Sequence, residues 1–233
     1  MVLGGIQKNS FIDYPGKISC VLFVFGCNFD CPYCHNPSLV KGNPAKDEKI
    51  EEDVIFDFLR SRREFLDGVV ISGGEPTLRK DLVSFCERVK DMGYPIKLDT
   101  NGSRPKVLDI LIRDDLVDYI AMDIKTIPEM YGVYIKRGLG PQEILASIRL
   151  IMESGKDYEF RTTCVKPIVD DHIIEMIGGL IRGANLFALQ SFVSREVLHP
   201  EFFQDIGAGY SEEELYNFKS IAEPWVKRCI VRC

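Results

Sequence analysis

Three cysteines, Cys27, Cys31 and Cys34, are separated by three and then two residues. Thiolates at this CX3CX2C spacing can hold three irons of a [4Fe–4S] cluster, which normally takes four cysteine ligands. The fourth iron would then accept an exogenous ligand. Two alternatives stay open from the spacing alone. A structural zinc site would lack an obvious fourth ligand, and a redox-active CxxC pair would leave Cys27 unused.

The other five of the eight cysteines do not extend this motif. Cys20, Cys86 and Cys164 lie in apolar or amphipathic runs and are expected to be buried as small hydrophobic side chains. Cys229 and Cys233 repeat a C-x3-C spacing near the end of the sequence, without a third partner, which favours an incidental pair over a second cluster. Disulfides are not expected, because no signal peptide precedes these cysteines.

Short β-branched or aromatic runs alternate with longer amphipathic runs along most of the chain. We expect helices over residues 51–65, 80–92, 105–113, 141–154, 171–182 and 212–223. The expected strands are Ile18–Phe25, Gly68–Ile71, Ile96–Asp99, Asp118–Met122, Tyr158–Thr163 and Leu186–Gln190.

This strict alternation predicts an α/β fold with a parallel sheet and right-handed crossovers. Six units favour an open (β/α)6 arrangement, which is a partial TIM barrel, and a doubly wound sheet is the competing arrangement. We expect a single domain over residues 1–233, with a core at about 17–192 and a C-terminal helical extension at about 193–233. In either arrangement, functional groups gather at the C-terminal ends of the strands.

Two polar motifs follow strands in the first half of the chain. Gly73 and Gly74 precede Glu75, and glycines allow backbone groups to approach a ligand closely. Asp99 and Thr100 begin an Asp-Thr-Asn-Gly motif whose oxygens could bind an ammonium group or a hard cation. A tight turn explains the glycines but not Glu75, and an Asx-type turn is the preferred alternative for the second motif taken alone.

Two further motifs follow the next strands. Asp123 and Lys125 are two residues apart on an extended segment and therefore face the same side. They suit a zwitterionic ligand of amino-acid size, and a solvated ion pair is the alternative. Arg161 could clamp a carboxylate or a ribose hydroxyl. Four polar motifs at successive strand ends predict one pocket beside the cysteine loop.

The net charge and the lengths of the apolar runs argue against some classes of function. A net charge of −6 over 233 residues argues against nonspecific nucleic-acid binding as the main activity. No apolar run approaches the ~18 residues that a membrane span needs, so no membrane association is expected. A reducing, cytoplasmic location fits exposed thiolates that are ready to bind a metal.

With these motifs in place, the chain resembles the radical S-adenosylmethionine (SAM) superfamily. Within it, the chain looks most like the activating enzymes of glycyl radical enzymes, notably the activating proteins of anaerobic ribonucleoside-triphosphate reductase. The resemblance runs from Ile12 to the sixth expected strand. Its most specific parts are the cysteine loop through Tyr33-Cys34-His35-Asn36-Pro37, Gly73-Gly74-Glu75, Asp99-Thr100-Asn101-Gly102 and Asp123-Ile124-Lys125.

The resemblance implies a role for each motif. The three motif cysteines would ligate three irons, and the amino and carboxylate groups of SAM would chelate the fourth. The glycine-rich motif would meet the methionine amino group. Asp99 and Asp123 would lie near the amino acid end of SAM, with a monovalent cation. Lys125 would approach the ribose or carboxylate of SAM, while Tyr33 and His35 would border its adenine; a packed loop histidine is the alternative for His35.

The implied chemistry belongs mainly to the cofactors. An electron from the reduced cluster would cleave SAM to methionine and a 5′-deoxyadenosyl radical, which would abstract hydrogen from a glycine of a partner glycyl radical enzyme. A flavodoxin or ferredoxin would supply the electron. The open alternatives are a radical SAM enzyme that modifies a small molecule or another peptide, and a noncatalytic iron–sulfur electron carrier.

The chain departs from the pattern of the family that it resembles in two places. Residues 35–85 contain no cysteine, so the ferredoxin-like insertion of some activating enzymes is absent there. At the sixth strand end, better-studied activating enzymes carry a histidine that contacts SAM. This chain has Gln190 at that place, and His199 comes later. We expect Gln190 to substitute for the histidine.

Overall fold

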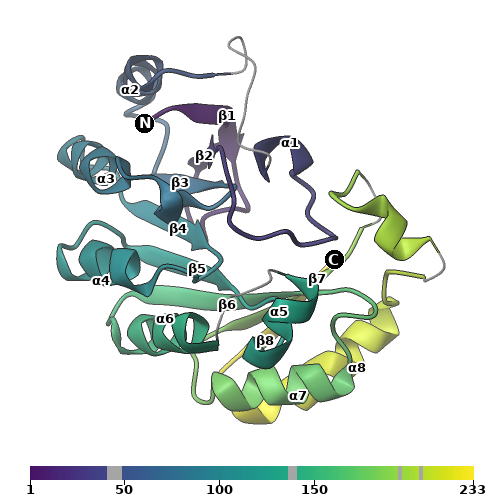
Figure 1. Cartoon of the computed structure of the whole chain (residues 1–233). Coiled ribbons are helices and arrows are strands. Elements are labelled where there is room, and N and C mark those ends of the chain that lie inside the picture. Colours follow the sequence, from purple (N-terminus) through teal and green to yellow (C-terminus); the bar gives the residue numbers. More distant parts are fainter. Residues whose placement is uncertain (41–48, 136–140, 194–195, 205–206) are drawn as a thin grey trace. The chain divides into compact units, whose positions relative to one another are not determined.

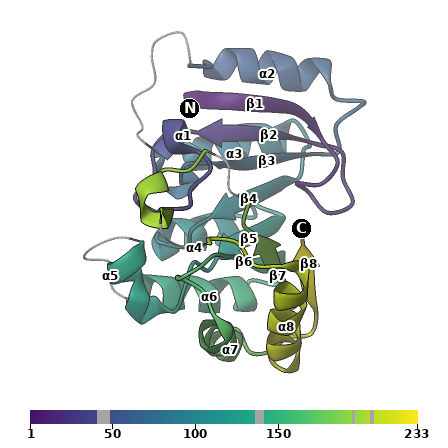
Figure 2. The same cartoon turned by 90° about the vertical axis from the view of Figure 1, so that its right-hand side faces the viewer.

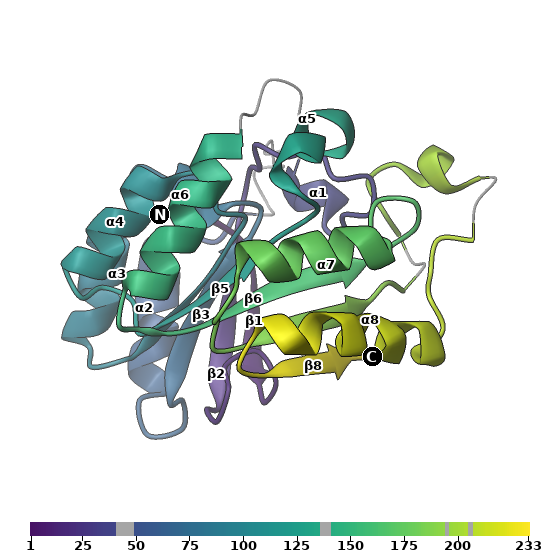
Figure 3. The ribbon, with the colours of Figure 1, turned by 90° about the horizontal axis from the view of Figure 1, so that it is seen from below.

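The computed structural model describes residues 1–40, 49–135, 141–193, 196–204 and 207–233. The chain divides into two compact units, which are described separately. The first comprises residues 1–28, 38–100 and 106–120, and the second comprises residues 29–37, 101–105 and 121–233. Figures 1 to 3 show the ribbon from three directions.

The first unit is built on four strands: β1 (Leu3–Ser10), β2 (Ser19–Val24), β3 (Gly68–Gly73) and β4 (Ile96–Thr100). β1 pairs antiparallel with β2, and β2, β3 and β4 pair in parallel. Helices α2 (Glu52–Ser61), α3 (Leu82–Asp91) and α4 (Pro105–Arg113) lie along one face of these strands (Figures 1 and 3). The short elements are α1 (Pro37–Val40) and the 3-10 turn η2 (Pro76–Leu78).

The second unit contains the parallel strands β6 (Asp157–Cys164), β7 (Phe187–Ser191) and β8 (Cys229–Arg232). Its longer helices are α6 (Pro141–Glu153), α7 (Asp171–Leu180) and α8 (Glu212–Ala222), and α7 and α8 lie side by side (Figures 1 and 2). Short elements complete it: η3 (Pro128–Met130), α5 (Tyr131–Tyr134), η4 (Pro200–Phe203) and η5 (Glu223–Trp225). β5 (Tyr119–Asp123) belongs partly to each unit.

Apolar runs become buried strands in both units. Leu22, Ile71 and Leu98 of the first unit are fully buried, as are Phe160 and Phe187 of the second. Strands covered on both faces are expected to read as near-continuous apolar runs, which explains why the sequence indicated them clearly.

Helix starts in the second unit are fixed by side chains. Asp170 precedes α7, and its carboxylate accepts a hydrogen bond from the Ile173 backbone at 2.8 Å. Ser211 and Glu214 form a reciprocal capping box at the start of α8. Such caps satisfy backbone donors that the first helical turn leaves without intrahelical partners.

The predicted α/β class is confirmed, and the six predicted strands correspond to β2 through β7 in chain order. All six predicted helices are present as α2, α3, α4, α6, α7 and α8. The sequence did not indicate β1, which contains two glycines and several polar residues. It also did not indicate β8, a four-residue strand within the expected helical extension. The single domain over 1–233 stays a prediction.

Among the described residues, no helix combines the length and the apolar character that crossing a membrane requires.

Candidate functional site

The glycine-rich turn after β3 packs closely against the end of β2. Gly73 has a φ of +115°, and a Cβ atom there would lie 2.4 Å from the Val24 nitrogen. A Cβ on Gly74 would lie 2.1 Å from the Gly26 oxygen. The backbone N–H groups of Gly74 and Glu75 donate to the carbonyls of Val24 and Gly26 at 2.9 and 2.8 Å. Only glycine fits both places, and the turn is thereby fixed next to the segment that leads into Cys27.

The Glu75 side chain is buried and forms hydrogen bonds within the protein. It is 1% exposed, and its Oε1 accepts hydrogen bonds from the Thr77 backbone at 3.1 Å, from the Thr77 hydroxyl, and from the Thr100 hydroxyl at 2.8 Å. These bonds connect the turn after β3 to the end of β4. Glu75 and Thr100 therefore hold the shape of the turn, which leaves backbone groups as the parts of this motif suited to a ligand.

Asp99 lies at the end of β4 in a charged environment. The ammonium group of Lys97, on the same side of the strand, bonds to its Oδ1, and the Ser72 hydroxyl donates to its Oδ2 at 3.2 Å. Lys97 is almost fully buried. Asn101 forms the predicted Asx-type turn, because its Oδ1 accepts from the Ser103 backbone at 3.0 Å.

In the second unit, Asp123, Lys125 and Arg161 form one group. Asp123 Oδ1 accepts from Arg161 Nε at 2.7 Å, and Oδ2 accepts from Lys125 Nζ at 2.9 Å. Burial by itself would raise the pKa of Asp123, but these two cations and their hydrogen bonds hold it well below its usual range. Burial would likewise lower the pKa of Lys125, but the Asp123 carboxylate raises it well above the usual value. Asp123 thus faces two protein cations, one at each carboxylate oxygen.

Tyr33 lies beside this group within the cysteine loop. The Cys34 N–H donates to the Cys31 carbonyl at 3.1 Å and closes a turn around Tyr33. The Tyr33 ring is 3% exposed, and Lys125 Nζ lies 5.9 Å from its centroid. Its buried hydroxyl has no hydrogen-bond partner among the described residues. A buried polar atom of this kind normally has a partner, so the hydroxyl marks a place where a polar ligand group fits.

His35 and Asn36 follow the cysteine loop and are exposed. The His35 ring stacks on Phe192 with centroids 5.5 Å apart and an interplanar angle of 22°. An open pocket of about 500 Å³ is lined by His35, Ser191, Val193 and Glu196. Gln190 is half-buried on β7, where it pairs in register with Arg232 of β8. The structure thus places one face of the exposed His35 ring on the buried Phe192, whose ring also stacks on Phe203.

A segment that the sequence did not indicate holds the cysteine loop. The backbone N–H groups of Leu198 and His199 donate to the carbonyls of Cys34 and Pro32 at 3.0 and 3.1 Å. The His199 ring bonds to Asp30 through Nε2 at 2.8 Å and to Glu201 through Nδ1 at 2.9 Å. The hydrogen bond to Asp30 is the main cause that raises the pKa of His199. No local pattern signals a contact between residues 169 positions apart.

The three motif cysteines differ in exposure. Cys31 is buried, Cys27 and Cys34 are half-buried, and none of the eight cysteines forms a disulfide. Within the described ranges, no three His, Cys, Asp or Glu side chains lie close enough together, as placed, to hold a metal ion. The assignment of these cysteines as cluster ligands therefore stays a prediction, based on their donor chemistry and spacing.

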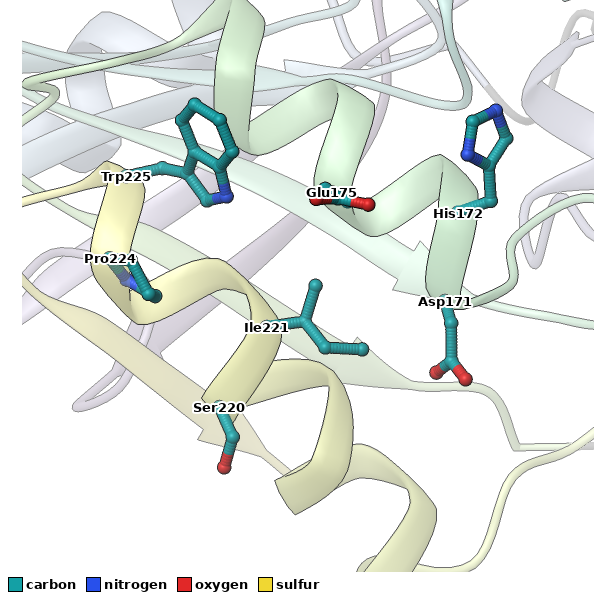
Figure 4. A pocket seen from close by; sticks show the side chains of 7 residues that line it. All are labelled: Asp171, His172, Glu175, Ser220, Ile221, Pro224 and Trp225. Carbon is teal, nitrogen blue, oxygen red and sulfur yellow. The ribbon is translucent and has the colours of Figure 1, made fainter.

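A second pocket lies on the helices of the second unit and contains none of the predicted site residues. It has a volume of about 630 Å³, and Figure 4 shows its lining on α7, α8 and η5: Asp171, His172, Glu175, Ser220, Ile221, Pro224 and Trp225.

Comparison with known proteins gives matches in sequence and in structure. The family described as the radical SAM superfamily matches residues 21–178. A Methanocaldococcus jannaschii protein, provisionally named a glycyl-radical enzyme activating enzyme, is 36% identical over 99% of this chain and 95% of the relative. The pyruvate formate-lyase-activating enzyme of Streptococcus mutans is 32% identical over 68% of this chain and 63% of that enzyme.

Among solved structures, Streptococcus suis SuiB superposes with a TM-score of 0.67 over 91% of this chain and 48% of SuiB. The two sequences are 14% identical, so this likeness concerns the fold.

Proposed function

The chain belongs to the radical SAM superfamily, and we propose that it is an activating enzyme that installs a glycyl radical in a partner enzyme. The observation that carries the proposal is the 36% identity over 99% of the chain to a relative with the name of such an activating enzyme. The 32% identity to a pyruvate formate-lyase-activating enzyme supports the same reaction class.

In this proposal Cys27, Cys31 and Cys34 hold a [4Fe–4S] cluster. When bound, the cluster and SAM supply a 5′-deoxyadenosyl radical. The protein contributes orientation and the exclusion of water. The hydrogen bonds from Leu198 and His199 support this role for the cysteine loop, because they fix the backbone on either side of Tyr33.

SAM is zwitterionic at its amino acid end, and each unit offers groups that suit it. The cations Lys125 and Arg161 beside Asp123 suit a carboxylate. The turn of Gly73, Gly74 and Glu75 would meet the amino group through its backbone, near Asp99 and Thr100. The remaining predicted contacts would serve the adenosine: Tyr33, His35, Asn36 and Gln190.

The proposed partners are a glycyl radical enzyme as protein substrate and a flavodoxin or ferredoxin as electron donor. The exposed His35 and the open pocket beside it offer an accessible surface for a substrate segment. A radical SAM enzyme that acts on a small molecule or another peptide would use the same cluster and SAM residues. Only identification of the hydrogen donor separates these two functions.

The ligand assignment is tested with Cys31→Ala. The wild-type chain, reconstituted anaerobically, is expected to bind about four irons and to form 5′-deoxyadenosine from SAM with dithionite. Cys31→Ala is expected to lose both the iron and the SAM cleavage. Cys233→Ala, which removes an exposed thiol outside the motif, serves as the control and should behave as wild type. Undiminished SAM cleavage by Cys31→Ala would refute the assignment.

A further inference from the structure

The carboxylate of Asp99 has a cationic partner from its own strand. Lys97 and Asp99 are two residues apart on β4, so their side chains leave the strand on the same face. The Lys97 ammonium bonds to Asp99 Oδ1 and lies 5.9 Å from the centroid of the Tyr119 ring. Side-chain exposure is 2% for Lys97 and 13% for Asp99, so water contributes little to balancing either charge.

A carboxylate withdrawn from water needs a counter-charge or donors that replace its hydration. Oxygen ligands of this kind bind hard cations when no protein cation is available. Here Lys97 already supplies the positive charge at Oδ1, and Ser72 donates to Oδ2. A sodium or potassium ion at Asp99 would have to compete with a tethered ammonium group.

Asp123, in the second unit, shows the same feature independently. Both of its carboxylate oxygens are bonded to protein cations, Arg161 at one oxygen and Lys125 at the other. An added cation at Asp123 would therefore lie beside two protein cations that already bond to its oxygens, which is electrostatically unfavourable. Neither aspartate motif thus needs an exogenous cation to balance its charge.

We propose that Lys97 is a positioning residue that acts as a built-in monovalent cation at Asp99, so that this enzyme binds SAM without added sodium or potassium. The inference rests on the proposed function, because it concerns the amino acid end of the SAM site. It replaces the expected monovalent cation with a side chain of the chain itself.

The first arm of the test uses the wild-type chain, reconstituted anaerobically, with SAM binding measured by equilibrium dialysis. Buffers of equal ionic strength contain potassium, sodium or choline chloride, so that general screening is the same in each. We expect the dissociation constant for SAM to change by less than about twofold among the three salts. SAM binding that tightens in potassium or sodium would overturn the inference and leave the proposed function standing. Absence of SAM binding in every salt would instead contradict the proposed function.

The second arm uses Lys97→Met, which keeps most of the buried stem and removes the charge. In choline chloride we expect this variant to bind SAM at least about tenfold more weakly than wild type, with recovery in potassium or sodium chloride. Its melting temperature without cluster or SAM should also rise in these two salts relative to choline. A folded Lys97→Met chain that gains neither response would overturn the inference.

The matched control is Lys90→Met. Lys90, on α3, also pairs with an aspartate of the first unit, Asp118, at 2.7 Å, but both side chains are partly exposed. This variant should keep the salt-independent SAM binding of wild type. A sodium or potassium response in Lys90→Met equal to that in Lys97→Met would show a general effect of lost charge and would overturn the inference. If Lys97→Met does not fold, the comparison of SAM binding by the wild-type chain in the three salts is the test of the inference.

Discussion

Four of the five cysteines outside the motif are buried, whereas Cys27 and Cys34 of the motif are half-buried. Cys20, Cys86, Cys164 and Cys229 are buried, and burial raises the pKa of each thiol to about 12. A thiol with such a pKa is about one ten-thousandth ionised near pH 8. These four side chains therefore serve packing, as the sequence predicted for Cys20, Cys86 and Cys164. The burial of Cys229 follows from β8, which the sequence did not indicate.

This difference predicts an alkylation pattern. Treatment of the native chain with iodoacetamide near pH 8 should leave the four buried thiols unlabelled and should label Cys34 and the exposed Cys233, as read by peptide mass spectrometry. After anaerobic reconstitution, Cys34 should become protected while Cys233 stays reactive. Persistent labelling of Cys34 in iron-loaded protein would contradict its role as a ligand.

The sequence predicted the types of the site residues better than their partners. Asp123 and Lys125 were expected to share a side, either toward a zwitterionic ligand or as an ion pair, and the structure pairs them. Arg161 joins them from 38 positions away, a contact that no local pattern specifies. Likewise, nothing in the sequence indicated that Lys97 would be buried against Asp99 rather than solvated.

The elements that carry the site were mostly predictable, because buried parallel strands and amphipathic helices leave periodic patterns. β1 and β8 were not predicted. β1 contains glycines and polar residues and β8 has only four residues, so each gives a weak sequence pattern. The irregular segment around His199 also lacked a pattern. Its backbone nevertheless donates two hydrogen bonds to the cysteine loop, in addition to the bond that the Asp30 N–H donates to the Ile135 carbonyl.

The bond between the His199 ring and Asp30 of the cysteine loop predicts that the His199 side chain helps to retain the cluster. His199→Ala should fold normally but release iron to a chelator roughly three- to tenfold faster than wild type, because two hydrogen bonds at partly exposed groups are lost. His172→Ala, at the pocket on α7, provides the matched control and should release iron at the wild-type rate. Equal release rates for the two variants would show that the His199 side chain does not help to retain the cluster.

For the whole molecule, the alternation of strands and helices was sufficient to predict the α/β class, and the spacing of a few motifs was sufficient to predict the superfamily. The proposed function draws on residues of both units, with the glycine-rich turn and Asp99 in the first and the Asp123 group in the second. The partner could not be predicted in the same way. The residues that bind the cluster and SAM are the same whichever substrate donates the hydrogen. Recognition of a protein substrate depends instead on surfaces that have no fixed sequence motif.

The most direct test of the central claim is electron paramagnetic resonance of a complete anaerobic reaction. The reconstituted and reduced chain is mixed with SAM and a candidate glycyl radical enzyme, preferably one encoded beside it. We predict a glycyl radical doublet that requires SAM and is lost when the radical-bearing glycine of that partner is replaced by alanine. 5′-Deoxyadenosine should accumulate together with the radical. Formation of 5′-deoxyadenosine without any protein radical, across candidate partners, would contradict the activating function and assign the radical to another substrate.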